Sequence, residues 1–170
     1  MNDTTKEAQF AAWMTEYGDD VLRTCYLYLG DRALAEDAMQ ESFLKVWRKM
    51  DAFARRDGAS PKTWITRIAI NTCKDALRMP WRRHVDLSRA FDDLPPAVSP
   101  ADEEERALML DVMRLPDRYK RPLLLYYVHE MTMDEIARTL GVSRASVSSR
   151  LQKAYALLRA DGKEFSHETK

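Results

Sequence analysis

The chain has 170 residues, 45% of them hydrophobic, and a formal net charge of zero, which is the composition of a globular protein with one ordinary domain or two small ones. Its longest apolar stretch, Leu123–Val128, is far shorter than the ~20 residues that span a bilayer. The amino-terminal stretch MNDTTKEAQF lacks the basic-then-apolar order of a secretory signal. We therefore expect a cytoplasmic protein without membrane spans.

The zero net charge hides a strong segregation of charge along the chain. Residues 51–84 carry eight basic and three acidic side chains, residues 85–117 carry three and nine, and residues 118–170 carry ten and six. Contacts with backbone phosphates dominate the affinity of proteins for nucleic acids. Two basic blocks on either side of an acidic block therefore predict two separate contacts with one polyanion.

The first predicted element is an amphipathic helix that ends at Gly30. Its apolar residues recur at spacings of three and four, which is the period of one helix face. They are Phe10, Trp13, Met14, Tyr17, Val21, Cys25 and Leu29. A glycine directly after the last periodic residue is a common helix terminator.

Asp31 is placed as the N-cap of a second helix with an apolar stripe and a polar side. The stripe consists of Ala35, Met39, Phe43, Val46, Trp47 and Met50. The polar side carries Asp37, Gln40, Glu41 and Arg48. Because the two carboxylates stand four residues apart, their repulsion weakens an isolated helix. They belong either to a face that meets a basic partner or to an ordinary solvated face.

A polar loop with Arg55, Arg56 and Gly58 comes next, and Ser60 and Pro61 then predict the N-cap and first residue of a third helix. This helix is expected to bury Ile65, Ile68, Ala69, Thr72 and Ala76. Another face carries Arg67, Asn71, Lys74 and Arg78. Cations and an amide beside a basic loop and an aromatic residue are typical of single-strand binding, with a merely solvated basic face as the alternative.

Residues 82–99 read as a linker between two domains, residues 7–81 and residues 100–162. The linker has poor periodicity and includes the proline-rich stretch DDLPPAVSP. Fully extended, it reaches on the order of 60 Å. That length lets two domains touch DNA sites nearly two turns apart, since one turn is about 34 Å.

A fourth helix is predicted from Ser99 as its cap and Pro100 as its first residue, with acidic side chains in the first turn. The stretch LLLYYVHEM is expected to be a buried helical run. Pro122, directly before it, is expected in the first turn of that helix, because a deeper position costs about 3 kcal/mol.

The stretch DEIARTLGVSRASVSSRLQKAYALLR predicts two helices joined by a tight turn at Gly141. Ile136, Ala137 and Leu140 bury the first helix, Ser143 caps the second, and Val147 and Leu151 hold the second down. The exposed positions of the second helix are Arg144, Ser146, Ser149, Arg150 and Lys153. Such a helix reads base edges in the major groove with its amino-terminal end, although a plain helical hairpin is the alternative.

The cysteines and histidines give no sign of catalysis or metal binding. Cys25 and Cys73 form no CxxC motif, and His84, His129 and His167 lack metal-ligand spacing. We expect two buried, reduced thiols rather than a disulfide or metal ligands. No glycine-rich phosphate loop and no nucleophile with an adjacent acid or base appears. Neither an enzyme nor a cofactor is therefore expected.

Taken together, these stretches resemble the extracytoplasmic-function (ECF) sigma factors, members of the sigma-70 family of bacterial transcription initiation factors. The resemblance runs from about Phe10 to Arg159. It is carried by LPDRY and EMTMDEIARTLGVSRASVSSRLQKA, from Leu115 onward, and by Asp37, Gln40, Glu41, Phe43, Trp47, Phe53, Thr63, Trp64, Arg67, Ile68, Asn71, Asp75 and Arg78.

The resemblance implies an all-α fold of two small helical domains joined by a flexible acidic linker. The first domain, sigma region 2, would bind core RNA polymerase through Asp37, Gln40 and Glu41 and recognise and melt the minus-ten promoter element. A loop over residues 53–60 would capture a flipped base. The residues expected to hold the strand are Arg55, Arg56, Lys62, Thr63, Arg67, Asn71 and Lys74. Trp64 is expected to be a core residue rather than a stacking platform.

The second domain, sigma region 4, would read the minus-thirty-five element as duplex DNA. The acidic linker would suit a basic channel of polymerase. The resemblance also implies an anti-sigma factor as a partner, besides core RNA polymerase and promoter DNA. Two rivals are a stand-alone helix-turn-helix regulator, which leaves the first domain unexplained, and an enzyme acting on nucleic acid, for which no catalytic constellation appears.

Overall fold

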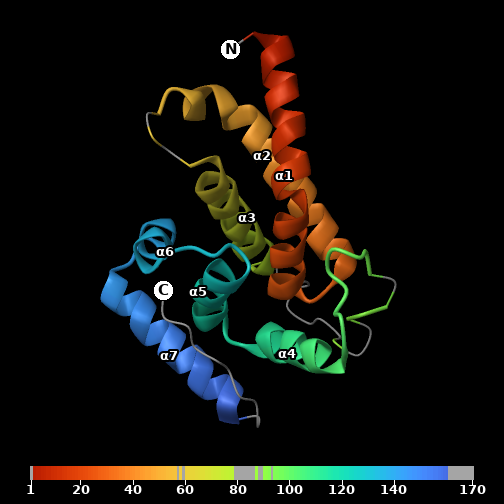
Figure 1. The fold of residues 1–170 in the computed structure, drawn as a ribbon, viewed down its shortest axis with the longest axis vertical. Coiled ribbons are helices and arrows are strands. Elements are labelled where there is room, and N and C mark those ends of the chain that lie inside the picture. The colour runs from red at the N-terminus through yellow and green to blue at the C-terminus, as the bar shows by residue number, and fades with distance from the viewer. Residues whose placement is uncertain are drawn as a thin grey trace. The chain divides into compact units, whose positions relative to one another are not determined.

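The computed structural model describes residues 2–56, 58, 60–78, 87, 90–92 and 94–160. Over these residues the fold is all-helical, as predicted. The chain divides into two compact units, residues 1–99 and residues 100–170 (Figure 1). The predicted class of two helical domains is confirmed.

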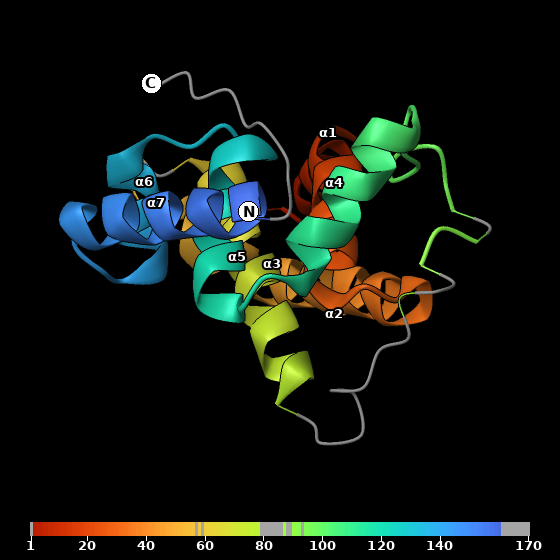
Figure 2. The same cartoon turned by 90° about the horizontal axis from the view of Figure 1, so that it is seen from below.

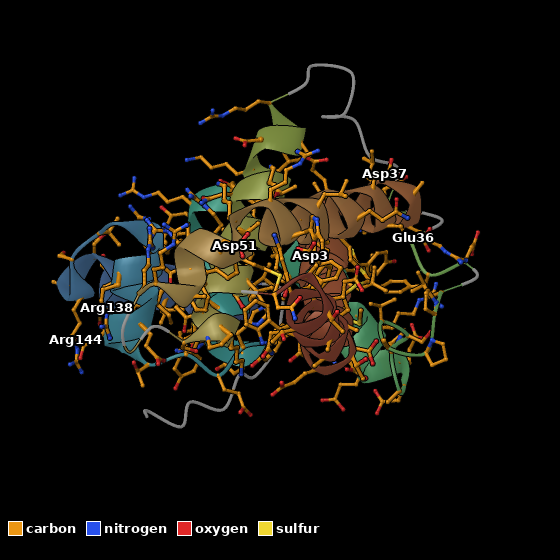
Figure 3. The ribbon with its side chains drawn as sticks, turned by 90° about the horizontal axis from the view of Figure 1, so that it is seen from above. Asp3, Glu36, Asp37, Asp51, Arg138 and Arg144 are labelled. Carbon is orange, nitrogen blue, oxygen red and sulfur yellow. The ribbon has the colours of Figure 1, made fainter. Side chains whose placement is uncertain are left out.

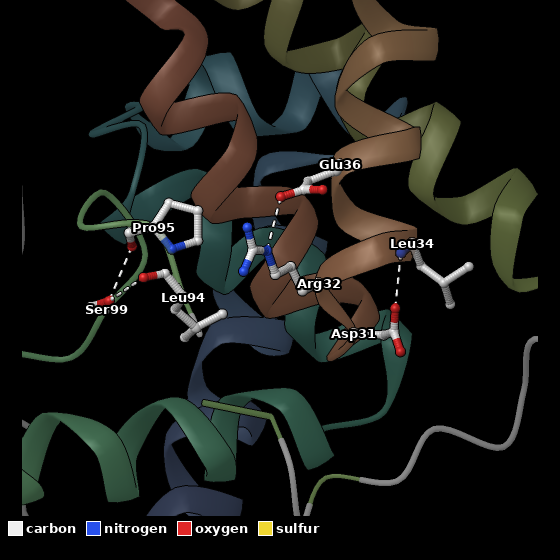
Figure 4. Close-up of polar contacts among 7 residues, drawn as sticks. All are labelled: Asp31, Arg32, Leu34, Glu36, Leu94, Pro95 and Ser99. Carbon is white, nitrogen blue, oxygen red and sulfur yellow. Dashed lines mark hydrogen bonds and ion pairs between the residues drawn. The ribbon is translucent and has the colours of Figure 1, made fainter. Parts of the chain in front are cut away.

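The first unit is built from three helices that pack on one another: α1 (Asp3–Leu29), α2 (Arg32–Ala54) and α3 (Pro61–Leu77). Gly30 ends α1 in the left-handed conformation, with φ of 69°. The side chain of Asp31 then accepts a hydrogen bond from the Leu34 N–H at 2.9 Å, as Figure 4 shows. One glycine and one capping carboxylate thus reverse the chain between two long helices, as predicted.

Aromatic rings tie these three helices together. Phe10 of α1 meets Trp47 of α2 edge-on, with ring centroids 5.2 Å apart. Trp64 of α3 stacks on Phe53 of α2, with ring centroids 4.3 Å apart and an interplanar angle of 14°. Trp13 of α1 meets both of those rings edge-on. Trp64 therefore packs on two aromatic rings of the bundle, but it stays partly exposed, so the expected core role is met only in part.

The start of α3 follows the prediction closely. The Ser60 hydroxyl accepts a hydrogen bond from the Thr63 N–H at 3.4 Å, and Pro61 is the first residue of the helix. Proline suits this position because its missing N–H would have no partner within the helix. The residues predicted to be buried by α3 are buried, except Ala76, which is partly exposed.

The end of the predicted linker belongs to the first unit. Ala90 and Val98 are buried, and the ring of Phe91 meets Tyr26 of α1 edge-on with centroids 6.2 Å apart. The acidic composition of this stretch concealed these apolar anchors. Residues 90–92 and 94–99 thus contribute apolar contacts to the first unit, and residues 79–86, 88, 89 and 93 lie outside the described part.

In the second unit, α4 (Glu103–Arg114) begins later than predicted. Its cap is Asp102, whose side chain accepts a hydrogen bond from the Glu105 N–H at 2.8 Å. The Glu105 carboxylate in turn accepts a hydrogen bond from the backbone just before the cap. The Ser99 hydroxyl donates instead to the carbonyl oxygen of Pro95 at 3.0 Å (Figure 4). The predicted Ser99 cap was wrong because a reciprocal pair of carboxylates starts the helix further along.

The position of Pro122 was also predicted wrongly. The helix α5 spans Asp117–Tyr127, so Pro122 is buried in its interior rather than in its first turn. The leucine run is the middle of this helix and not its beginning. The helix also stops before the end of LLLYYVHEM, and Glu130 takes a positive φ of 51° in the turn that follows.

The last two helices form a tight pair, α6 (Met133–Leu140) and α7 (Arg144–Ala160), and both pack on α5 (Figure 2). Gly141 allows the turn between them with φ of 68°. The Ser143 hydroxyl accepts a hydrogen bond from the Ser146 N–H at 3.1 Å and caps α7, as predicted. The apolar residues predicted to hold this pair are buried, except Leu140, which is partly exposed.

Both cysteines, Cys25 and Cys73, are buried and free of disulfide bonds, as predicted. In the described residues, no group of three or more histidine, cysteine, aspartate or glutamate side chains is arranged to hold a metal ion. His84 and His167 lie outside that part of the chain. No helix among the described residues has both the length and the apolar character needed to cross a membrane.

Candidate nucleic-acid interface

One side of α2 forms an exposed acidic face, which we define as Asp37, Gln40 and Glu41. All three side chains are exposed, and Figure 3 shows Asp37 projecting outward from α2. The nearest described cation to Glu41 is Lys45, whose Nζ lies 4.0 Å from the Glu41 carboxylate and donates to Thr72 Oγ1 of α3 at 3.1 Å. The structure therefore presents the predicted acidic residues together, on one helix, to whatever binds there.

Two further residues extend this face. Leu44, one helical turn beyond Gln40, is 49% exposed although it is apolar. Asp75 of α3 lines a hollow of about 310 Å³ together with Asp37 and Glu41. The packing of α3 against α2 brings Asp75 there, which no pattern within one helix could show. In the sequence, Leu44 could have been recognised as part of this face, because it is a large apolar residue among polar ones.

The loop between α2 and α3 carries two exposed arginines, Arg55 and Arg56. The Nε of Arg55 donates to the Asp51 carbonyl at 3.1 Å, which holds its stem along the end of α2. Gly58 takes a positive φ of 72°, a conformation that side chains other than glycine rarely adopt. Gly58 thus takes a turn conformation two residues before the cap of α3, and Arg55 and Arg56 are both accessible to a partner.

The basic stripe of α3, which we define as Arg67, Asn71, Lys74 and Arg78, faces away from the core. Arg67, Asn71 and Arg78 are exposed, whereas Lys74 is partly buried. Arg78 lies 3.7 Å from the Asp75 carboxylate, so its charge is partly compensated. Arg67 and Asn71 are the exposed members of the stripe for which the structure records no ion pair among the residues that it describes.

The other predicted strand-binding residues lie at the start of α3. Lys62 and Thr63 are partly buried, so they present a smaller surface than Arg67. Between them and the stripe, one face of the Trp64 ring is covered by Phe53. Cations and an amide, rather than a free aromatic ring, are thus the groups that this region offers to a nucleic acid.

In the second unit, the amino-terminal end of α7 carries the predicted duplex-reading residues. Arg144, Ser149 and Lys153 are exposed, in agreement with the prediction. Ser146 and Arg150 are partly buried, so their predicted exposure was wrong. These two residues lie four positions apart, next to the buried stripe that packs on the rest of the unit.

Arg144 is held by a partner on the neighbouring helix. Its guanidinium lies 3.4 Å from the Asp134 carboxylate of α6. Arg138, which the sequence did not single out, lines an open hollow of about 620 Å³ with Asp134 and Arg144 around the turn. Figure 3 shows Arg138 and Arg144 projecting close to one another. Two cations thus flank the turn between α6 and α7.

A tyrosine pair anchors the far half of α7. The hydroxyl oxygens of Tyr155 on α7 and Tyr127 on α5 lie 3.0 Å apart. Burial, together with this hydrogen bond and the neighbouring phenol, raises the pKa of Tyr155 far above its usual value. Tyr155 therefore stays neutral and fixes the angle at which α7 leaves α5.

Comparisons with known proteins place both units in families of known description. Residues 8–83 match the family model described as Sigma-70 region 2, and residues 106–158 match that described as Sigma-70, region 4.

Among curated relatives, SigM of Bacillus subtilis, an ECF RNA polymerase sigma factor, is 30% identical over 152 residues, covering 85% of this chain and 89% of SigM. A second relative, described as "Probable RNA polymerase sigma factor RfaY" of Xanthomonas campestris pv. campestris, is 36% identical over 140 residues, or 76% of this chain. The chain spans only 34% of the length of that relative.

Among solved structures, the sigma factor RpoE from Bartonella quintana, solved with the anti-sigma factor NepR, has a TM-score of 0.65 at 22% identity. The match covers 88% of this chain and 98% of RpoE. At this identity the likeness concerns the fold alone.

Proposed function

The chain belongs to the ECF subfamily of the sigma-70 family, RNA polymerase sigma factors that direct promoter-specific transcription initiation and are not enzymes, and we propose that it reads its promoter at two points. In this proposal, residues 7–81 bind core RNA polymerase and open the minus-ten element. Residues 100–162 bind the minus-thirty-five element as duplex, and residues 82–99 connect the two. The observation that carries the proposal is that the first unit exposes an acidic and a basic surface on adjacent helices.

The acidic face of α2 is the proposed contact with core polymerase. Its carboxylates are exposed, and complementary charge steers a basic partner toward such a face. The exposed Leu44 beside them supplies an apolar centre, and interfaces derive most of their affinity from such buried centres. Asp75 adds a third carboxylate from α3.

The loop at residues 53–60 and the basic stripe of α3 are the proposed contacts with the opened minus-ten strand. Arg55, Arg56, Arg67 and Asn71 are exposed, and guanidinium groups bind the phosphates of a flexible strand without a fixed register. Lys62, Thr63 and Lys74 support them from partly buried positions. An exposed amide such as that of Asn71 can pair with the edge of a base that has left the stack.

The amino-terminal end of α7 is the proposed reader of the minus-thirty-five duplex. Arg144 and Ser149 are exposed at the end that enters a major groove, and Lys153 follows one turn later. Asp134 lies 3.4 Å from the Arg144 guanidinium, but both side chains are exposed, so this ion pair is weak and DNA phosphates or bases can replace it. Ser146 and Arg150 lie on the flank of the helix and are closer to the DNA backbone than to base edges in this arrangement.

We further propose that the chain works in the cytoplasm, where polymerase and promoter DNA are found, and that an anti-sigma factor controls it. The fold that it shares with RpoE, which was solved with NepR, supports this partner class. The acidic residues between the two units suit a basic channel of polymerase. The proposed activity requires no cofactor or metal bound to the chain.

Run-off transcription with purified core polymerase tests the proposal. The chain and core together should produce transcripts with defined start sites from a subset of genomic fragments, and core alone should not. The start sites should share two upstream sequence blocks, since two units read the promoter. Transcripts that do not depend on the chain, or a chain that binds DNA tightly but never joins core polymerase, would contradict it and favour a stand-alone regulator.

A further inference from the structure

The guanidinium of Arg150 on α7 is held in an unusual setting. The side chain is partly buried on the flank of α7, and its Nε is buried with no hydrogen-bond partner. Such an orphaned donor costs free energy, because it has lost water and gained nothing in return. A buried donor without a partner calls for a specific explanation, and the binding of an ion is one of them.

Two further arginines come from α5, which packs directly on α7. Arg118 is exposed, and the side chain of Arg121 is 17% exposed. Burial, followed by the positive charges of Arg118 and Arg121, lowers the pKa of Arg150. The packing of α5 on α7 thus places two cations of α5 where their charge acts on Arg150, and the Nε atoms of both Arg121 and Arg150 are buried.

One carboxylate compensates only part of this charge. Asp117 lies 3.2 Å from the Nε of Arg121, in a geometry that makes no hydrogen bond to that nitrogen. Its other oxygen is buried without a hydrogen-bond partner. The cluster thus consists of three cations and one anion, and it retains positive charge and two buried donors without hydrogen-bond partners among the described residues, the Nε atoms of Arg121 and Arg150.

We propose that Arg118, Arg121 and Arg150 form a binding site for a phosphate of the promoter duplex backbone. The inference rests on the proposed reading of duplex DNA by α7 and assigns a role to α5, which that proposal leaves without one. Guanidinium groups match the geometry of phosphate oxygens and bind them in pairs of hydrogen bonds.

The position of the cluster on α7 supports a DNA phosphate as its ligand. Ser146 and Lys153 lie four residues before and three residues after Arg150, so all three share one flank of the helix. This flank borders the exposed Ser149, which belongs to the proposed base-reading surface. A phosphate bound between α5 and α7 would fix the register of α7 in the groove without reading sequence.

The test measures binding of the holoenzyme to matched and scrambled upstream duplexes at several salt concentrations. Arg118→Gln is the main variant, because Arg118 is exposed and can be replaced without disturbing the core. It should weaken binding to both duplexes on the order of tenfold and reduce the slope of log affinity against log salt by about one. Arg150→Lys keeps the charge but loses the planar guanidinium group. It should therefore weaken binding to both duplexes by a smaller factor than Arg118→Gln does.

Arg159→Gln, nine residues beyond Arg150 on the same helix, is the matched control and should leave the salt slope unchanged. Thermal unfolding separates ligand binding from a structural role, because removing one of three repelling cations should leave the melting temperature of Arg118→Gln equal or higher. The inference would be overturned if Arg118→Gln left the slope of log affinity against log salt unchanged. It would also be overturned if this variant lost affinity for the matched duplex alone. If the wild-type holoenzyme itself bound no upstream duplex, the proposed function would fail first and the inference with it.

Discussion

Two helices of this chain, α3 and α7, carry cations proposed to meet DNA, yet their surroundings differ. On α3, Arg67 stands exposed beside Asn71, free to follow an irregular partner. On α7, Arg144 is paired with Asp134, and Arg150 is partly buried among other arginines. A single strand has no fixed shape, whereas a duplex presents phosphates at fixed spacing. Each helix also has an exposed arginine in an ion pair, Arg78 at the end of α3 and Arg144 on α7, so the difference between the two helices lies in the partly buried Arg150.

A third surface sharpens the contrast, because the acidic face of α2 lies in the same unit as α3 and has the opposite charge. A protein surface cannot attract DNA and polymerase equally well with the same groups. Asp75 shows how close the two surfaces come, since it lines the acidic hollow and also lies 3.7 Å from Arg78 of the basic stripe. Because Asp75 belongs to both surfaces, a charge reversal meant for one surface only should be placed at residues other than Asp75.

The largest expected effect is on the acidic face. Asp37→Arg combined with Glu41→Arg should reduce the affinity for core polymerase by about 100-fold or more, because two carboxylates facing a basic partner become two repelling cations. A pull-down with purified core measures it. The same charge change at Glu7→Arg with Glu16→Arg, two exposed acids of α1, is the control and should bind core as the wild type does. Equal affinity of the α2 variant and the wild type would exclude this face.

An intermediate effect is expected at the turn between α6 and α7. Arg144→Ala should lower the preference for a matched over a scrambled minus-thirty-five duplex about tenfold, since one good contact with a base edge discriminates by 1–3 kcal/mol. Competition binding of the holoenzyme gives the ratio. Asp134→Asn should keep most of the affinity for the matched duplex and should reduce the preference for it by less than Arg144→Ala does. The reason is that this variant removes the ion pair of Arg144 but keeps the arginine. A preference unchanged in Arg144→Ala would place base reading elsewhere.

The smallest effect belongs to a scaffold contact outside all three surfaces. Lys6 of α1 lies 2.8 Å from the Asp51 carboxylate of α2, and this hydrogen bond with Lys6 lowers the pKa of Asp51. A lowered carboxylate pKa contributes stability above the unfolded-state value of about 3.9 and loses it as the pH falls through the folded-state value. Asp51→Asn should thus melt slightly below the wild type at pH 7 and equally at pH values below the lowered folded-state pKa of Asp51.

Differential scanning calorimetry across this pH range checks the scaffold prediction, with promoter binding at neutral pH as the control. Binding should not change, because Asp51 belongs to none of the three surfaces. A gap in melting temperature that persists at low pH would show that Asp51 stabilises through packing and not through its charge.

The parts of this fold that local chemistry determines were predictable from the sequence. Gly30, Asp31, Ser60 and Gly141 ended or began helices where expected, because each acts on its immediate neighbours. The start of α4 was missed because two signals competed, and the Asp102 cap with its Glu105 partner prevailed over Ser99.

The candidate surfaces were harder to predict where they depend on contacts between helices. The acidic residues of α2 could be predicted, since they lie on one helix. The burial of Arg150 and its approach to Arg118 depend on how α5 packs against α7, which no periodicity records. Asp75 reached the acidic hollow in the same way, through the packing of α3 on α2.

The central claim is that the two units divide the work, so that the basic stripe of α3 serves promoter opening and not promoter finding. The most direct measurement uses holoenzyme with Asn71→Ala and Lys74→Ala on an ordinary duplex and on a promoter with a pre-opened mismatch bubble. Binding of the closed duplex should stay near wild type, whereas transcription from it should fall on the order of tenfold. The bubble should restore part of the activity, because it removes the cost of unpairing but not the need to hold the strand. Full activity on the closed duplex, or a loss that the bubble leaves untouched, would contradict the claim.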